Sequence, residues 1–416
     1  MLGSRICATS TEEKLDVIQI EENHDHDRRR FALFELGFRP FFSAAGMFSI
    51  LSMLVWMLIY VFSISLPLAG SAPITWHAHE MVYGYSMAVI AGFLLTAVSN
   101  WTGIRTWRGT PLFGLLACWL VARVAWLLPY SYSMFLAAIT DLLFMFGLLV
   151  GVALPLIRVR QWKQFGILSK LVLMILANGM FYAGALGYLE EGTRWGLYAG
   201  IYLVLALIFV MARRVLPFFI ERGVGENFTP RNRPWLDITS LILFMAWMVF
   251  DVFLVQPMIV SWLSLALVIL HSVRLYDWYT PGIWKHPLLW SLYLAYFFLT
   301  FSFLLKGMSF WIGISPNVSL HGFAVGGIGM ITAGMMSRVT LGHTGRNVFK
   351  PPPVVGLMFA TVAMAMIFRV VLPLFDNNHY TLWIVISQLA WITGFSIFSI
   401  VFIPQLVWSR IDGRPG

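Results

Sequence analysis

Residues 76–98 read WHAHEMVYGYSMAVIAGFLLTAV, in which two histidines and a glutamate precede an apolar run. The run from Val82 to Val98 is long enough to cross a membrane as a helix. Imidazole and carboxylate groups cost free energy next to hydrocarbon, so ionisable residues in such places usually mark a functional site. The stretch therefore indicates both the fold class and the place to look for function.

The whole chain has the composition of a membrane protein. Hydrophobic residues make up 59% of it and charged residues 11%, and the mean hydropathy is +0.79. A chain that spans a bilayer must satisfy its backbone internally, which leaves helices or a closed barrel. Continuous apolar runs differ from the alternating pattern of barrel strands. We therefore predict an all-α, polytopic integral membrane protein.

Apolar segments of membrane-spanning length predict about twelve transmembrane helices. They lie near residues 40–65, 76–99, 111–128, 132–155, 168–189, 194–212, 235–254, 257–274, 286–305, 317–340, 353–374 and 380–407. We assign residues 1–38 to a flexible cytoplasmic tail without a cleavable signal peptide, and residues 39–416 to a single transmembrane helical domain. No internal repeat is apparent, and the two cysteines, Cys7 and Cys118, are not expected to form a disulfide.

The distribution of lysine and arginine predicts the orientation. Basic residues are frequent in the N-terminal tail, in the even-numbered connections and at the C-terminus, and they are nearly absent from the odd-numbered connections. By the positive-inside rule, both termini lie in the cytoplasm. The same rule accounts for the net charge of +9. The chain is expected to contact membrane lipid, and no nucleic-acid partner is predicted.

The predicted topology sorts the histidines by depth. His77 and His79 begin the second predicted helix and His321 begins the tenth, so these three imidazoles share one level near the outer boundary. His271 and His343 lie toward the inner side. At a rise of about 1.5 Å per residue, His321 and His343 differ in depth by roughly the hydrocarbon thickness, so one metal cannot use both. The outer three form the main candidate metal site, and the inner two are further candidates.

The two neighbouring histidines are not expected to hold one ion together. Residues two apart on a regular helix point about 200° away from each other. His77 shares its face with Glu80, and His79 shares its face with Tyr83. The two histidines would therefore serve two neighbouring centres. Alternatively, one imidazole would bind a metal and the other would act as a hydrogen-bonding group. Neutral imidazole suits haem iron and copper.

Small residues in the tenth predicted helix give a second signal. Gly322, Gly326, Gly329 and Ala333 recur at spacings of three and four beside the face that carries His321. Such a stripe ordinarily lets another helix approach closely. The alternative is that a flat macrocycle lies against it.

Arginines near the membrane ends also have two interpretations. Arg39, Arg214 and Arg338 suit ordinary inner-surface anchors, or they pair with haem propionates. Arg123 lies within an apolar run toward the outer side, as does Arg369. Each of these two is expected to have a buried partner, such as Asp141 or an outer-leaflet propionate.

Several stretches together resemble the NnrS family of bacterial membrane proteins. They are LGFRPFF (residues 36–42), WHAHEM (76–81), AGFLLTAV (91–98), NWTG (100–103), RVLPFF (214–219) and MSRVTLGHTGR (336–346). Any single piece would be a weak signal, but the joint match in the expected order is specific.

The resemblance implies a twelve-helix protein of the bacterial inner membrane that carries haem b, with copper as a further metal, and takes part in the response to nitric oxide. The family histidines correspond to His77, His79, His321 and His343, with His271 as a further member. The function that we expect is a haem-containing membrane protein that binds or handles nitric oxide and protects against nitrosative stress. The assignment of each histidine to a metal stays open.

Two other functions stay open at this point. One is a nitric oxide reductase that takes electrons from quinol, although the adjacent pair of histidines typical of the copper site in haem–copper oxidases is absent. The other is a secondary transporter, which would favour broken helices and related halves. Neither feature is clear in the sequence.

Overall fold

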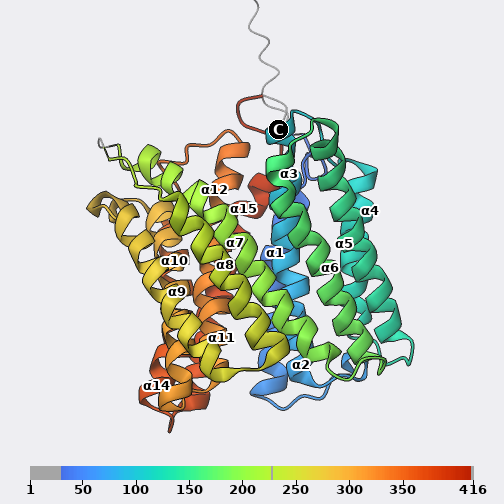
Figure 1. Ribbon diagram of the computed structural model, residues 1–416. Coiled ribbons are helices and arrows are strands. Elements are labelled where there is room, and N and C mark those ends of the chain that lie inside the picture. Colours follow the sequence, from blue (N-terminus) through green and yellow to red (C-terminus); the bar gives the residue numbers. More distant parts are fainter. Residues whose placement is uncertain (1–29, 226–227, 414–416) are drawn as a thin grey trace, which may run out of the picture.

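The computed structural model describes residues 30–225 and 228–413. This part of the chain is a bundle of helices in which most elements run roughly side by side, as Figure 1 shows, and it contains no β-strand element. The predicted all-α class is confirmed. Eleven of the described helices are long and apolar enough to span a membrane, and a twelfth, α4, is apolar but shorter.

Each of the twelve predicted segments corresponds to one span. In chain order the spans are α1 (Phe38–Tyr60); α2 (Pro73–His79) with η2 (Glu80–Ser86) and α3 (Met87–Thr102); α4 (Thr110–Ala125); α5 (Ser133–Arg158); α6 (Phe165–Ala185); α7 (Gly192–Val224); α8 (Pro234–Val249) with η4 (Phe250–Leu254); α9 (Pro257–Trp278); α10 (Pro287–Ile312); α11 (Pro316–His321) with η6 (Gly322–Gly329) and α12 (Met330–His343); α13 (Val354–Met366) with η7 (Ile367–Val371) and α14 (Leu372–Phe375); and α15 (Tyr380–Val407). Short 3₁₀ turns, η1 (Leu68–Gly70), η3 (Trp162–Gln164) and η5 (Pro281–Lys285), lie between spans.

Proline and glycine set many of the helix ends. Helices α2, α8, α9, α10 and α11 each begin with proline in the first turn, where its missing N–H has no intrahelical partner to lose. Gly103 and Gly313 end α3 and α10 with positive φ values of 68° and 70°, a conformation that glycine adopts without a side-chain clash. Local sequence therefore determines where these spans start and stop.

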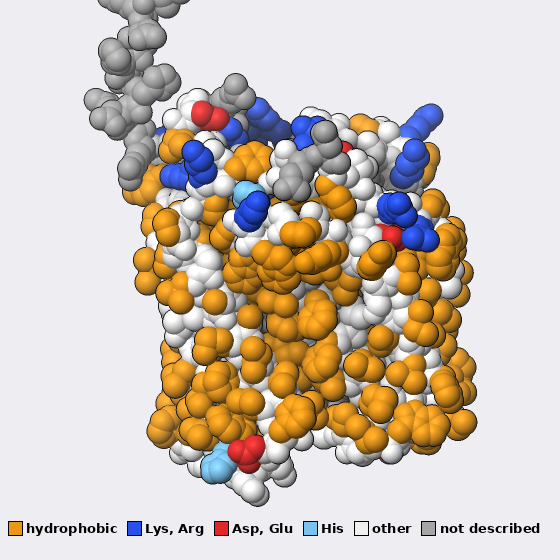
Figure 2. Space-filling model, turned by 90° about the vertical axis from the view of Figure 1, so that its left-hand side faces the viewer, with side chains coloured by type: hydrophobic (Ala, Val, Ile, Leu, Met, Phe, Trp, Pro, Cys, Tyr) orange, Lys and Arg blue, Asp and Glu red, His pale blue; other side chains and the backbone are white. Residues whose placement is uncertain are grey.

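The second and tenth spans form the centre of the bundle. Within their most apolar stretches, 83% and 72% of the residues are buried, against 33–50% for the peripheral spans such as α1, α8 and α13. The peripheral helices expose large apolar side chains, among them Leu143, Phe146 and Ile242. Figure 2 shows one such face, where hydrophobic side chains cover the middle of the molecule and Lys and Arg gather at one end. This pattern is that of a multi-pass membrane protein.

The two described chain ends lie together at the basic end. The backbone N–H of Ser409 donates to the carbonyl oxygen of Arg30 at 2.9 Å, and Figure 1 places the C-terminus at the end opposite α2, α11 and α14. By the positive-inside rule the basic end faces the cytoplasm. We call the opposite end, with α2, α11 and α14, the outer end.

The last residues of the segment predicted as the tail lie against the bundle. Residues 30–32 run beside the end of α15: the N–H of Ala32 donates to the carbonyl oxygen of Val407 at 2.8 Å, and Ala32 is 1% exposed. The polar composition of the tail concealed this short packed segment. Residues 1–29, to which the rest of the tail assignment applies, lie outside the described residues.

Several spans contain a π-helical segment, which the sequence analysis did not predict. η2 follows His79 directly, and η6 follows His321 directly. A π-helical segment holds an extra residue per turn and is frequent at functional sites. The two outer histidine positions therefore coincide with irregular helix geometry.

Helix α6 packs very closely on α7 through Gly196. A Cβ atom at this position would lie 2.6 Å from the carbonyl oxygen of Ala177 on α6. Gly196→Ala is therefore expected to lower the thermal unfolding midpoint of the purified protein by several degrees, because overpacking of this kind costs about 1–3 kcal/mol. The matched control is Gly179→Ala on α6, where a Cβ atom meets nothing within 4 Å.

The control is expected to keep or raise the midpoint, because alanine favours helix over glycine by about 1 kcal/mol. Equal midpoints for the two variants would contradict the close packing of α6 on α7.

Candidate functional site

The second span directs its two histidines to different sides. The ring of His77 stacks on Trp56 of α1, with ring centroids 4.4 Å apart and an interplanar angle of 12°. His79 is fully buried and packs against Phe181 of α6 at 4.4 Å and Trp126 at 5.0 Å. The expected separation of the two imidazoles is what the structure has.

Both ring nitrogens of His79 are occupied by protein groups. Nδ1 lies 3.0 Å from Glu80 Oε1, and Nε2 lies 3.1 Å from Asn178 Oδ1. Asn178 Nδ2 donates to Asp141 Oδ2 at 3.1 Å, so its Oδ1 faces His79 and accepts a hydrogen bond from Nε2. The Nδ1 contact then needs one proton, on His79 or on Glu80. The two residues therefore share a buried proton.

Arg123 neutralises the carboxylates of this group. Its Nη2 lies 2.8 Å from Asp141 Oδ1, and its Nε lies 3.3 Å from Glu80 Oε2. Tyr182 donates to Asp141 Oδ2 at 3.1 Å. Arg123 is 5% exposed and both carboxylates are at most 1% exposed. Asp141 was one of the partners that the sequence suggested for Arg123 or Arg369, and it pairs with Arg123. The residues His79, Glu80, Arg123, Asp141, Asn178 and Tyr182 are called the His79 network below.

The His79 network gives protein partners to His79, predicted as a metal ligand, and to Glu80, predicted as a cofactor contact. A metal would have to displace Asn178 or Glu80 from the imidazole, and the charges are already balanced when the shared proton is counted. Within the part of the chain that the structure describes, no group of three or more His, Cys, Asp or Glu side chains is placed to hold a metal ion.

His321 has one ring nitrogen fixed by the backbone. Its Nδ1 donates to the carbonyl oxygen of Asn317 at 2.7 Å, so Nε2 carries the free lone pair. Arg369 Nη2 lies 3.2 Å from both ring nitrogens, so it lies across the imidazole and not along the lone pair of Nε2. An imidazole with Nδ1–H bonded to a carbonyl is the tautomer typical of metal-binding histidines.

Arg369 contacts His321, and His77 lies within electrostatic range of both residues. Tyr380 flanks the guanidinium of Arg369, whose carbon lies 5.9 Å from the Tyr380 ring centroid, and Tyr60 is also within electrostatic range. His77 Nδ1 and Arg369 Nη1 are buried without a hydrogen-bond partner among the described residues. These five residues are called the outer cluster. They come from α1, α2, α11, η7 and α15.

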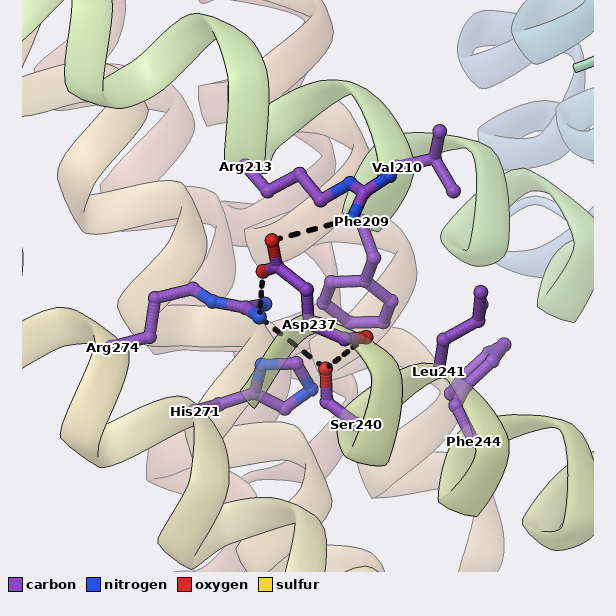
Figure 3. A pocket seen from close by; sticks show the side chains of 9 residues that line it. All are labelled: Phe209, Val210, Arg213, Asp237, Ser240, Leu241, Phe244, His271 and Arg274. Carbon is purple, nitrogen blue, oxygen red and sulfur yellow. Dashed lines mark hydrogen bonds and ion pairs between the residues drawn. The ribbon is translucent and has the colours of Figure 1, made fainter. Parts of the chain in front are cut away.

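The inner histidine His271 belongs to a polar group around a small cavity, shown in Figure 3. Tyr296 Oη accepts from Arg274 Nη1 at 2.8 Å and shares a hydrogen bond with His271 Nδ1 at 2.7 Å. Arg274 and Arg213 both pair with Asp237, at 2.7 and 3.2 Å. The cavity has a volume of about 20 Å³, which suits one water and not a macrocycle.

His343 lies elsewhere at the inner end. Its ring packs on Phe38 with centroids 5.4 Å apart, and its Nε2 lies 3.5 Å from Asn100 Nδ2. Arg410 donates to its backbone oxygen at 3.1 Å. Of the five candidate metal ligands, His77 and His321 are the two at the outer end that lie within electrostatic range of each other.

The stripe of small residues serves helix packing. A Cβ atom on Gly322 would lie 2.4 Å from Ser302 Oγ of α10, and one on Gly326 would lie 2.5 Å from Met366 of α13. These neighbouring helices leave no room for a flat macrocycle on this face, so the cofactor interpretation of the two glycines is corrected. Tyr83 likewise has a structural partner, since its hydroxyl donates to the carbonyl oxygen of Gly196 at 2.7 Å.

Three arginines proposed for propionates have other partners. Arg39 Nη1 donates to the carbonyl oxygens of Leu406 and Trp408 at 2.9 and 2.7 Å and so holds the end of α15. Arg214 donates to Gln164 Oε1 at 2.8 Å. The guanidinium of Arg338 lies 3.7 Å above the ring of Phe219. The anchor interpretation fits all three. Arg369, for which a buried partner or an outer-leaflet propionate was expected, contacts the candidate histidine His321.

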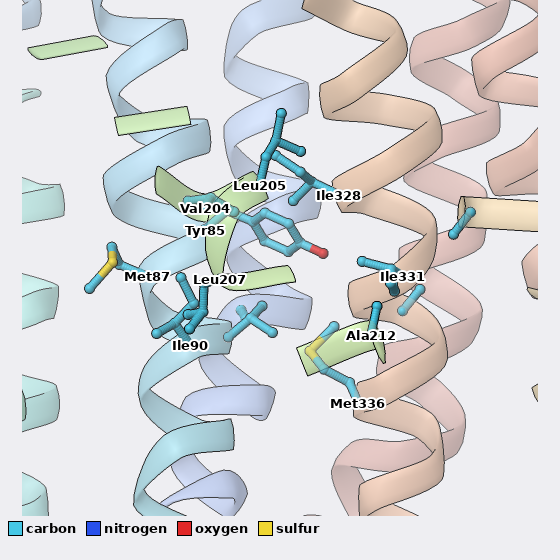
Figure 4. Packing of buried hydrophobic residues seen from close by; sticks show 14 of the residues in the cluster. Tyr85, Met87, Ile90, Val204, Leu205, Leu207, Ala212, Ile328, Ile331 and Met336 are labelled. Atoms are coloured by element: carbon cyan, nitrogen blue, oxygen red, sulfur yellow. The ribbon is translucent and has the colours of Figure 1, made fainter. Parts of the chain in front are cut away.

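An apolar cavity of about 80 Å³ lies between α1, α3, α7 and α12. Ile90, Leu207 and Ile331 are among the side chains that line it, and Figure 4 shows them packed near Tyr85. Thr332 donates its proton to the carbonyl oxygen of Ile328, so Tyr85 donates to Thr332 Oγ1 at 2.7 Å. The polar atoms beside the cavity are thus satisfied, and its wall is almost wholly apolar.

The His79 network is expected to be a large source of stability. Asp141→Asn removes one carboxylate from a buried guanidinium, and breaking a buried pair of this kind costs about 3 kcal/mol or more. The matched control is Glu191→Gln, which removes the exposed pair of Glu191 with Arg194 and should cost less than about 1 kcal/mol. Thermal unfolding of the two purified variants checks this. A midpoint for Asp141→Asn as high as that of the control would contradict the pairing.

Comparison with known proteins agrees with the helical architecture. A family model described as NnrS protein matches residues 32–410, which is nearly the whole chain. A search of curated proteins finds no match. The matched range contains all twelve spans, the His79 network and the outer cluster. The chain therefore belongs to the NnrS family, and this membership supports a membrane protein associated with the nitric oxide response.

Proposed function

We propose that this protein carries a haem in the bacterial inner membrane, where it binds nitric oxide and protects against nitrosative stress. The observation that carries the proposal is that His321 and His77, from separate spans, lie within electrostatic range of each other at the outer end of the bundle. Membership of the NnrS family supports the link to nitric oxide.

The donor chemistry of the outer cluster fits haem iron. His321 offers a neutral imidazole whose Nδ1–H is held by Asn317 and whose Nε2 is free to bind a metal. His77 offers a second imidazole with an unpartnered Nδ1, held in orientation by the stack on Trp56. These two residues would hold the haem, whose iron would supply the centre that binds nitric oxide. His79 is left out of this proposal because protein groups contact both its ring nitrogens.

The apolar cavity gives nitric oxide a place within the bundle. Nitric oxide is small and uncharged, and apolar cavities of this size bind small apolar molecules rather than water. The cavity is bordered by α3 and α12, the helices that continue the spans of His77 and His321. Being uncharged, nitric oxide would reach this cavity from the lipid without a hydrophilic channel.

Copper is the second metal that we propose for this pair of imidazoles, because both metals accept neutral nitrogen donors. A quinol-dependent nitric oxide reductase is the enzymatic alternative. It would need a second reactive centre near the first, and the engagement of His79 in its own network argues against a three-histidine centre. Formation of nitrous oxide by the purified protein with a quinol donor would establish the enzyme.

The proposal predicts a haem absorption band in the purified protein. His321→Ala is expected to abolish the Soret band, and His77→Ala to weaken or shift it, because each removes a proposed iron ligand. The matched control is His379→Ala, since His379 is exposed and pairs with Asp376 on the outer surface. The band of the reduced wild type should shift on addition of nitric oxide.

Optical spectra and metal analysis of the three variants and the wild type make the measurement. A wild-type protein without haem or copper, or a Soret band that survives His321→Ala unchanged, would overturn the proposal.

A further inference from the structure

The spans that contain His79 and His321 match each other in sequence. His79, Gly84, Ala91-Gly92 and Thr102-Gly103 recur, in the same order and with the same spacing, as His321, Gly326, Ala333-Gly334 and Thr344-Gly345. No insertion or deletion is needed between them. Because the identical positions are few, the repeat is not apparent from the sequence alone.

The two spans also have the same irregular shape. Each begins with a short helix opened by a proline, α2 at Pro73 and α11 at Pro316. Each continues as a π-helical segment directly after the histidine, η2 and η6, and then as a long, largely buried helix, α3 and α12. Both spans therefore share the same order of short α-helix, π-helical segment and long α-helix, which a chance match in sequence would not produce.

The matching glycines touch matching neighbours. A Cβ atom on Gly84 would meet Phe48 of α1 and Arg123 of α4, and one on Gly326 would meet Phe298 of α10 and Met366 of α13. Deeper in the bundle, Gly92 packs on α1 and Gly334 packs on α10. Helices α1 and α4 therefore correspond to α10 and α13.

The remaining helices follow the same correspondence. Arg123-Val124 near the outer end of α4 matches Arg369-Val370 in η7. On α5 and α15, Asp141 and Gly147 have the same spacing as Gln388 and Gly394, and the two glycines pack on α4 and α13. We call α1 to α5 the first unit and α10 to α15 the second unit. Such parallel repeats occur in several membrane protein folds.

The two units differ in their carboxylates. In the first unit, Arg123 pairs with Glu80 and Asp141. In the second unit, Gly322 and Gln388 stand at these two positions. Among the described residues, no carboxylate lies within ion-pair distance of Arg369.

Several buried polar atoms in the second unit, and one on α2 beside it, have no hydrogen-bond partner among the described residues. They are Arg369 Nη1, His77 Nδ1, and both amide atoms of Gln388. A largely buried guanidinium without an anion is costly, and unpaired amide atoms add to this cost. The first unit shows which groups are missing, namely oxygens that carry negative charge.

We propose that the outer cluster binds a small two-oxygen anion, of the nitrite or carboxylate type, which takes the place of Glu80 and Asp141 in the second unit. The planar guanidinium of Arg369 suits a pair of parallel hydrogen bonds to such an anion. Tyr380 and His77 lie beside it as further hydrogen-bonding groups. The anion has two sources, a free ion or the propionate of a bound haem, and only the second rests on the proposed function.

The test uses the purified full-length protein in detergent. Sodium nitrite and sodium acetate are titrated at constant ionic strength, with chloride as the reference salt, and the thermal unfolding midpoint and haem content are recorded. Arg369→Gln is expected to weaken the apparent anion affinity at least tenfold. The matched control Arg214→Gln, whose partner is Gln164 at the inner end, should keep wild-type affinity.

A second variant supplies the missing carboxylate as a side chain of the protein. Gln388→Glu places an acid where the first unit has Asp141, and it should reduce anion affinity while keeping or raising the unfolding midpoint in chloride. This variant keeps the proposal open to refutation if Arg369→Gln does not fold.

The outcomes separate the two sources. If nitrite or acetate raises the unfolding midpoint and this rise requires Arg369, the anion is a free ion. This result would stand even if no variant contained haem. No effect of free anions, together with loss of haem from Arg369→Gln but not from Arg214→Gln, supports a propionate. Affinities and haem contents that are equal in all variants would overturn the proposal.

Discussion

A charged group inside hydrocarbon needs a partner of opposite charge, and this constraint governs the arrangement of the bundle. The hydrophobic effect does little to determine which side of a helix faces its neighbours, because lipid tails are as apolar as leucine. Ion pairs between helices do determine which sides face each other. Arg123 with Asp141 fixes α4 against α5, and Lys306 with Asp251 fixes α10 against η4 at 2.8 Å. Around these pairs the apolar side chains fill the remaining space.

The fold could be predicted from sequence because its signals are local. Length and hydropathy are properties of one segment at a time, so all twelve spans lie where apolar runs predict them. The depth of His77 and His321 follows from topology, and the divergence of His77 from His79 follows from helix geometry. These predictions need no knowledge of which helices are neighbours.

The site was harder to predict because its partners come from distant segments. His79 is held by Asn178, which lies on another helix, and nothing local to His79 indicates that contact. The same is true of Gly322, whose neighbour is Ser302 rather than a macrocycle. Arg369 meets His321 only because η7 packs beside α11. A comparison of the first and second units would have indicated from sequence that Arg369 and His321 lie close together, as Arg123 and His79 do.

The short helix α4 has a consequence for the surrounding lipid. Its 16 residues extend about 24 Å, against about 30 Å for the hydrocarbon of a typical bilayer. A bilayer adapts to such a mismatch by thinning locally. Because Arg123 lies in the last turn of α4, the thinning would bring outer-leaflet headgroups and water toward the His79 network. The protein would thus deform the membrane on one flank only, and neighbouring proteins would experience an asymmetric lipid environment there.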